Sequence, residues 1–304
     1  MAYDLENRLV IGVSSRALFD LTRENEIFET EGLDAYCSYM VGHEDEVLKP
    51  GPGFKLIKAL LNINKLKGQE GRVEVIIMSR NSADTSLRVF HSIEHYGLDI
   101  TRAVLASGGS LAPYLNAFRT DLFLSAYEDD VQSAIDSGIA AGIICNDVNK
   151  QYDVDEDLKQ IHIAFDGDAV LFSEESEMIY QKDGLKAFEA NEKNNRNVPL
   201  HQGPFAKFLK TLSDLQREFS PEEVPIRTAL VTARNAPSHE RVIKTLRAWN
   251  VRIDEAFFLG GISKKDVLEA FGAHIFFDDQ AIHTTPASEV VPSARVPYKQ
   301  NKEE

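Results

Sequence analysis

The chain has 304 residues, of which 43% are hydrophobic, and a formal net charge of −15. This length suits two domains, and the composition is typical of a globular protein with a full core in each. The excess of acidic residues argues against nucleic-acid binding, which needs a basic surface. The apolar runs are too short to span a membrane and the first residues lack a signal pattern, so we expect a cytoplasmic protein with no membrane contact.

The residue types that bind zinc or form disulfides are sparse. The two cysteines, Cys37 and Cys145, have neither a metal-binding spacing nor the number needed for a disulfide framework. The eight histidines are scattered and form no paired motif. A zinc site is therefore not expected.

The first half of the chain, residues 1–150, repeats in the second half, residues 158–304. Matching residues are separated by 152 positions near the start, by 154 positions around Arg80, and by 153 positions afterwards. The matched pairs include Gly32-Leu33 with Gly184-Leu185, Gly51-Pro52 with Gly203-Pro204, Arg80-Asn81 with Arg234-Asn235, and Arg88-Val89 with Arg241-Val242. A shift that stays nearly constant over more than a hundred positions indicates an ancient duplication of one domain.

Apolar runs alternate with amphipathic stretches in both halves, which predicts α/β domains with parallel sheets. The polar segment 147–160 is expected to link them. In the second half the predicted strands are Ile161–Phe165, Ile226–Val231, Glu255–Leu259 and His274–Phe277, and the predicted helices are 203–219 and 237–250. The charged segment 173–202 is long for a loop between a strand and a helix, and we interpret it as a small lid insertion.

Candidate site residues, most of them polar, follow each predicted strand of the second half. Asp166 and Asp168 follow the first strand, Thr232 and Ala233 the second, Lys264 the third, and the Asp278-Asp279 pair the fourth. Functional groups gather at the carboxyl ends of parallel strands, so these side chains should meet at one edge. Clustered carboxylates require a cation such as Mg²⁺, and the hydroxyl and ammonium groups suit phosphate oxygens. One carboxylate could attack phosphorus while a second moves a proton.

This ordered set resembles the haloacid dehalogenase-like phosphohydrolase superfamily. The stretches VSSRALF (13–19), AFDGDAVLFS (164–173), LVTARNA (230–236) and HIFFDDQ (274–280) further resemble the cytosolic 5′-nucleotidase type I family, over about residues 9–298. The resemblance implies two Rossmann-like halves of the haloacid dehalogenase type, of which the second carries the site. It also implies Mg²⁺-dependent hydrolysis of nucleoside 5′-monophosphates, with AMP a favoured candidate.

The resemblance also assigns roles. Asp166 is the expected nucleophile and Asp168 the acid/base. Thr232, Ala233 and Lys264 are expected at the phosphate, with Lys265 as an alternative to Lys264. The candidate metal ligands are Asp166, Asp168, Asp278 and Asp279, and Phe172, Tyr180 and Phe188 are candidates to stack on a base, although Phe188 is better explained as core.

Structural explanations compete with some of these roles. Thr232 could cap the following helix, and Lys264 or the Asp278-Asp279 pair could simply begin helices. Two other functions also stay open, namely a phosphatase for sugar phosphates and a nucleotide-binding regulator with vestigial hydrolysis. The sequence does not give the preferred base or the oligomeric state, and a homo-oligomer is left open.

The first half lacks all the proposed catalytic residues. The matching positions hold Ser14, Arg16, Met78, Leu111 and the Ser125-Ala126 pair. This half should therefore keep the fold without the chemistry. This half could keep a nucleotide-sized pocket around Ser14, Arg16, Arg80 and Asn81, because arginine suits phosphate. Only position supports a regulatory site there, so a purely structural role is favoured.

Overall fold

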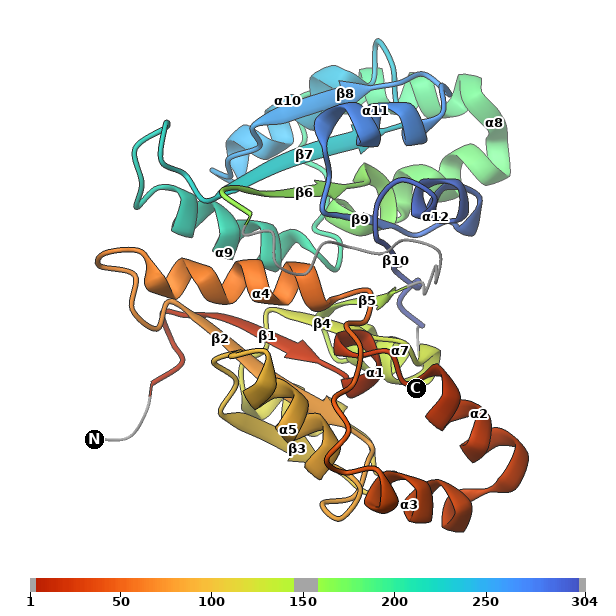
Figure 1. The fold of residues 1–304 in the computed structure, drawn as a ribbon. Coiled ribbons are helices and arrows are strands. Elements are labelled where there is room, and N and C mark those ends of the chain that lie inside the picture. The colour runs from red at the N-terminus through yellow and green to blue at the C-terminus, as the bar shows by residue number, and fades with distance from the viewer. Residues whose placement is uncertain (1–3, 145–157, 301–304) are drawn as a thin grey trace. The chain divides into compact units, whose positions relative to one another are not determined.

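The computed structural model describes residues 4–144 and 158–300 (Figure 1). Strands and helices alternate along the chain, which confirms the predicted α/β class, and the strands pair mostly in parallel. The chain divides into two compact units, Met1–Ile139 with Ile143–Asp157 and Ala140–Gly142 with Leu158–Glu304. Cys145 and most of the predicted linker lie outside the described residues.

The strands within residues 4–144 follow the order β3-β2-β1-β4-β5, so the first strand in the chain lies in the middle, and the residues of β5 are divided between the two units. Helices lie on both faces of these strands (Figure 1). The elements are β1 (Leu9–Val13), α1 (Ser15–Leu18), α2 (Thr22–Glu31), α3 (Leu33–Gly42), α4 (Phe54–Asn62), the 3₁₀ turn Ile63–Lys65, β2 (Val73–Ser79), α5 (Leu87–His95), β3 (Arg102–Leu105), α6 (Ala112–Ala117), β4 (Leu122–Ser125), α7 (Glu128–Asp136) and β5 (Ala140–Ile144).

The second unit has the same pattern of strands, in the order β8-β7-β6-β9-β10. Its elements are β6 (Ile161–Phe165), a π turn (Gly167–Leu171), α8 (Glu175–Asn194), α9 (Ala206–Gln216), β7 (Ile226–Thr232), α10 (His239–Ala248), β8 (Glu255–Phe258), α11 (Lys264–Phe271), β9 (Ile275–Asp278), α12 (Ala281–Ser288) and β10 (Ser293–Arg295). The four predicted strands and two predicted helices are confirmed, with ends that agree to within three residues. None of the described helices is both long and apolar enough to cross a membrane.

A core of aromatic rings fixes the strands that carry the site. Phe165 at the end of β6 stacks on Phe277 of β9, with ring centroids 5.7 Å apart. The ring of Phe205, just before α9, lies 4.7 Å from that of Phe277. All three side chains are fully buried, and each such ring pair adds about 0.5–1.5 kcal/mol beyond the burial itself. The packing of these rings therefore holds the ends of β6 and β9, and with them the residues that follow, in fixed positions.

The segment after β6, interpreted from the sequence as a lid insertion, is mainly helical. Residues 175–194 form α8, which is interrupted at Gly184, where φ is 80° and ψ is −179°. The first unit has α2 and α3 at the matching place, and Gly32 between them has φ of 89° and ψ of −178°. Such backbone angles are accessible only to glycine, which explains this residue type at both positions.

Candidate active site

Two aspartates from neighbouring strands define the centre of the site. Asp166 directly follows β6, and its backbone N–H donates to the carbonyl of Phe277 in β9 (2.8 Å). Asp278 is the last residue of β9. Both side chains are buried, and one carboxylate oxygen from each of Asp166, Asp278 and Asp279 lies within 4.8 Å of the others. Three carboxylates at this separation repel one another unless a cation lies among them.

Lys264 supplies a cation from the chain itself. It begins α11, and its Nζ donates to Oδ1 of Asp166 and to Oδ2 of Asp278, both at 2.6 Å. Burial alone would lower the pKa of this ammonium, but the charges of the two aspartates raise it above its usual value. Lys265, the alternative, instead forms an ion pair with Glu289 on the surface. The structure therefore brings Lys264, and not Lys265, to the carboxylates.

The carboxyl groups still carry an excess of negative charge. Burial raises the pKa of Asp166 to about 6, although Lys264 opposes the rise. Burial, together with the charge of Asp166, raises the pKa of Asp279 to about 7, while the Tyr298 hydroxyl stabilises its charged form by donating a hydrogen bond. Burial likewise raises the pKa of Asp278. These raised values indicate a site that would release protons when a divalent cation binds.

The raised pKa of Asp279 predicts that the stability of the metal-free protein depends on pH. The measurement is made in a metal chelator. The native pKa of about 7 exceeds the usual aspartate value of about 3.9. The native state therefore binds this proton more tightly, and the wild-type free energy of unfolding should fall, relative to that of Asp279→Asn, as the pH rises from about 4 to about 7. Urea titrations of both proteins across this range measure the difference. If the free energy of unfolding of the wild type, relative to that of Asp279→Asn, stayed constant or increased with pH, the raised pKa would be contradicted.

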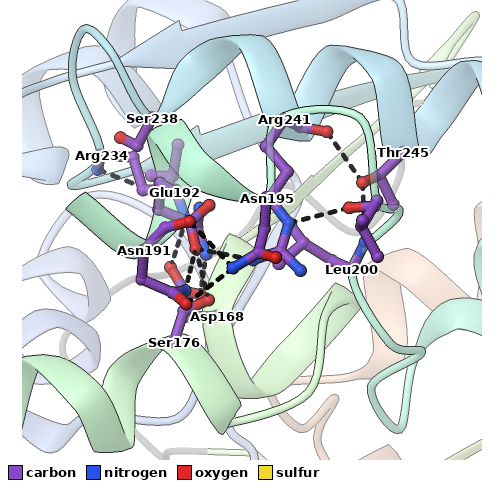
Figure 2. A network of polar contacts seen from close by, with 12 residues as sticks. Asp168, Ser176, Asn191, Glu192, Asn195, Leu200, Arg234, Ser238, Arg241 and Thr245 are labelled. Carbon is purple, nitrogen blue, oxygen red and sulfur yellow. Dashed lines mark hydrogen bonds and ion pairs between the residues drawn. The ribbon is translucent and has the colours of Figure 1, made fainter. Parts of the chain in front are cut away.

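Asp168 lies on a sharp turn that points it toward a different partner. Gly167 separates it from Asp166, and Ala169 beyond it adopts a left-handed φ of 59°. Both carboxylate oxygens of Asp168 accept from Arg234, at 2.6 and 2.8 Å (Figure 2). Asp168 is absent from the group of three carboxylates described above. Although Asp166 and Asp168 are only two residues apart, the turn therefore places their carboxylates in different surroundings.

Arg234 continues into a buried ionic network (Figure 2). Glu192 of α8 accepts from Arg234 at 2.6 Å and from Arg241 of α10 at 2.9 Å. Ser176, near the start of α8, also donates to Glu192 (2.9 Å). The Glu192 carboxylate is fully buried, and the two arginines balance its charge while Ser176 and Asn191 donate further hydrogen bonds. The network ties α8 to Asp168 through a single arginine.

Neutralising Glu192 should destabilise the protein. In Glu192→Gln the two arginines lose their buried counter-charge while an amide oxygen remains, so we expect a loss of about 2 kcal/mol in the free energy of unfolding. Glu175→Gln is the matched control, because Glu175 lies on the same helix with its side chain 53% exposed. Urea unfolding measures both. Equal stabilities of the two variants would show that the network contributes nothing.

Thr232 ends β7 and is buried, with its hydroxyl accepting from the backbone N–H of Arg234 (3.2 Å). It does not cap the next helix, as the sequence had allowed, because α10 begins at His239 and its N-cap is Ser238. A Cβ placed on Gly167 would lie 3.3 Å from the Thr232 hydroxyl, so the two strand ends meet. Ala233 follows with its side chain exposed.

The aromatic candidates differ in exposure. Phe172 is fully buried, and its ring lies 5.6 Å from that of Trp249. Phe188 is buried as expected and lies 5.2 Å from the Arg234 guanidinium. Tyr180 of α8 is 47% exposed. Of the three, Tyr180 has the most free surface for a planar group.

The sequence motifs did not assign site roles to Arg234, Glu192, Arg241 or Tyr298. Arg234 stood inside the quoted stretch LVTARNA and matched Arg80 in the repeat, so its position offered a signal. Glu192 stands in a run of charged residues that resembles any exposed helix. Only the packing of α8 shows that this particular carboxylate is buried.

The matching positions of the first unit hold no such arrangement. Ser14 caps α1 by accepting from the Ala17 N–H (3.2 Å), and Met78 and Leu111 are buried in the core. Among the described residues, the group Asp166, Asp278 and Asp279 is the one found that could hold a metal ion. That the first half lacks the chemistry stays a prediction.

The chain matches the sequence profile of the 5′-nucleotidase family over residues 1–303. It belongs to this family. The match confirms the family resemblance seen in the sequence motifs. The human protein named cytosolic 5′-nucleotidase 1B is 40% identical over 288 residues, which cover 91% of this chain. These residues are 47% of the human protein, so the chain spans about half the length of that relative.

Comparison with solved structures gives only weak likenesses. A chain of the Pnkp1/Rnl/Hen1 complex covers 99% of this chain and 100% of its own length, with 10% identity and a TM-score of 0.33. Histidinol dehydrogenase from Elizabethkingia anophelis covers 96% of this chain and 74% of its own, with 9% identity and a TM-score of 0.23. Similarities this low carry no argument about function.

Proposed function

We propose that this 5′-nucleotidase family member hydrolyses nucleoside 5′-monophosphates in a Mg²⁺-dependent reaction with an aspartyl-phosphate intermediate. The observation that carries the proposal is the buried contact of Lys264 with both Asp166 and Asp278, beside Asp279. A buried cluster of charges lowers the stability of the fold, and such clusters are typical of functional sites. Its place at the carboxyl ends of β6 and β9 is where ligands bind in parallel sheets.

The donor set suits Mg²⁺. Carboxylate oxygens are hard ligands, and those of Asp166, Asp278 and Asp279 can converge on one ion. Their raised pKa values follow from burial without a sufficient counter-charge. When bound, the ion would neutralise the carboxylates and polarise the phosphate. Asp168, also proposed as a ligand, has both oxygens on Arg234 and lies outside the group of three carboxylates, so we assign it the role of proton carrier and not of ligand.

In the first step a carboxylate oxygen of Asp166 attacks phosphorus and the bond from phosphorus to the ester oxygen breaks. Asp168 gives its proton to the departing oxygen, so the nucleoside leaves as an alcohol. In the second step water attacks the phosphorus, Asp168 takes a proton from that water, and Asp166 is released with inorganic phosphate. Each oxygen of Asp168 keeps a lone pair beyond the one directed at Arg234, so it can carry this proton.

The phosphate oxygens need donors that are already in position. Lys264 offers its ammonium, Thr232 its hydroxyl and Ala233 its backbone N–H, all at the ends of rigid elements. For the base, the exposed ring of Tyr180 is better supported than Phe172, whose ring is fully buried. Asp279 is assigned either as a metal ligand or as a residue that supports a metal ligand. The Tyr298 hydroxyl orients the Asp279 carboxylate by donating a hydrogen bond to it.

The nucleotide substrate rests on the family and on the name of the human relative, and AMP is the favoured candidate. The same residues could act on a sugar phosphate, and a nucleotide-binding regulator would also keep the fold. Phosphate release from a panel of nucleoside 5′-monophosphates and sugar phosphates, with and without Mg²⁺, separates these functions. Release of phosphate from sugar phosphates alone would support the mechanism but exclude a nucleotide substrate. Binding of nucleotides without release of phosphate would favour the nucleotide-binding regulator.

We further propose that the two units are duplicates and that α8 acts as a lid. The two strand orders correspond one to one, and bridges join Phe19 with Pro50 in one unit and Phe172 with Gln202 in the other. The matching interruptions at Gly32 and Gly184 support the same origin. A cytosolic location, in line with the relative's name, completes the proposal.

A further inference from the structure

A cavity of about 400 Å³ lies in the first unit, at the carboxyl ends of β1, β2 and β3. In the second unit the corresponding strands are β6, β7 and β8, which are followed or ended by Asp166, Thr232 and Lys264. Its volume falls in the range of about 300–1,000 Å³ typical of small-molecule sites. Ser14, Arg16, Arg80 and Asn81, which the repeat had singled out, all line the cavity.

Most of the charged residues around the cavity form ion pairs, but one positively charged side chain does not. Asp130 pairs with Arg80 at 2.5 Å, and Glu24 pairs with Arg88 at 2.6 Å. Among the described residues that line the cavity, Arg16 is the cation with no carboxylate partner. Its buried Nε has no hydrogen-bond partner there, and its guanidinium lies 5.5 Å from the ring of Tyr127. A buried guanidinium N–H without an acceptor is costly, so the position fits an incoming anion.

The charge at the strand ends is inverted relative to the active site. Arg16 stands where the second unit has Asp168, and Ser14 stands where it has Asp166. The two carboxylates that line the cavity are already paired with arginines, so no acidic cluster remains to hold Mg²⁺. An anion would therefore bind to Arg16 directly, without a bridging metal ion.

One wall of the cavity is apolar and partly open to solvent. Phe28 is 48% exposed, Leu33 61% and Tyr127 40%. The ring of Phe28 lies edge-on to that of Tyr36, with centroids 5.9 Å apart. Exposed aromatic surface beside a charged group suits a ligand that has both an aromatic ring and a negative charge.

We propose that the first unit binds a small aromatic anion, with its charged group at Arg16 and its ring against Phe28, Leu33 and Tyr36. A carboxylate and a phosphate monoester share this chemistry, because both pair with a guanidinium in the same bidentate way. The site is separate from the carboxylate cluster of the second unit, and its existence does not depend on the proposed nucleotidase reaction.

The test uses the full chain in a metal chelator and isothermal titration with three probes, namely phenyl phosphate, benzoate and inorganic phosphate. We expect at least one aromatic probe to bind with one site per chain, and inorganic phosphate to bind at least about tenfold more weakly. The tighter of the two aromatic probes identifies the anion. Failure of both aromatic probes to bind, or equal binding of inorganic phosphate, would overturn the proposal.

Variants locate the binding. Arg16→Gln should weaken it about tenfold or more, because a charge-assisted contact is lost, whereas Arg23→Gln, at an exposed arginine outside the cavity, should not. Leu33→Glu should weaken binding through repulsion, while Leu33→Gln serves as its neutral control at the same exposed position. Loss of binding in Asp166→Asn with unchanged binding in Arg16→Gln would assign the probe to the second unit and refute the proposal.

Discussion

Replacing Asp166 with asparagine is expected to lower the rate of phosphate release by a factor on the order of 10³ or more, because the amide cannot attack phosphorus. The fold should survive, since the substitution removes one negative charge from a crowded, buried cluster and keeps the shape of the side chain. Unfolding by urea in a chelator should therefore show a free energy at least equal to that of the wild type. Phosphate release and unfolding are measured on the same preparations.

Asp214→Asn is the matched control for this substitution. Asp214 lies in the same unit, and its side chain is 55% exposed and paired with Arg217 on the surface. Neutralising it should change neither activity nor stability by a measurable amount. An active and well-folded Asp166→Asn protein would refute the assignment of Asp166 as nucleophile.

Replacing Lys264 with methionine should have the largest effect on stability. Asp166 and Asp278 would lose their buried cation, and removing one partner of a buried ion pair typically costs about 3–5 kcal/mol. This loss should be seen at pH 8 in a chelator, where the carboxylates cannot escape the repulsion by taking up protons. Saturating Mg²⁺ should restore part of the stability, because the ion would supply the missing positive charge.

Lys265→Met tests whether the effect belongs to this position. Lys265 follows directly in α11, but it pairs with Glu289 and both side chains reach solvent. Its replacement should change the free energy of unfolding by less than about 0.5 kcal/mol. Phosphate release should fall about 100-fold or more in Lys264→Met and stay near the wild-type rate in Lys265→Met. Similar losses in the two variants would contradict the assignment of Lys264.

The two units show how the same fold can present opposite charges at the ends of its strands. The second unit gathers Asp166, Asp278 and Asp279, which invites a cation. The first unit presents Arg16 beside a cavity whose acids are already paired. The order of the strands is the same in both units, and the side chains at the strand ends differ.

The sequence by itself determined the α/β class, the strands of the second unit and the aspartates that follow them. This was possible because a buried parallel strand such as β6 leaves an unbroken apolar run, and polar residues directly behind it mark the edge where ligands bind. The order of Asp166, Thr232, Lys264 and Asp278 along the chain was sufficient to indicate the family, which the profile match confirmed.

Only the tertiary structure decided between neighbouring residues of the same type. Lys264 and Lys265 are indistinguishable by composition, and the turn of α11 alone directs the first to the carboxylates and the second to Glu289. Similarly, nothing local distinguishes Glu192 from the other charged residues of α8, because its burial depends on Arg234 and Arg241, 42 and 49 residues further along the chain. The charge of a side chain can be read from the sequence, but its partner depends on contacts that form only when distant segments pack together.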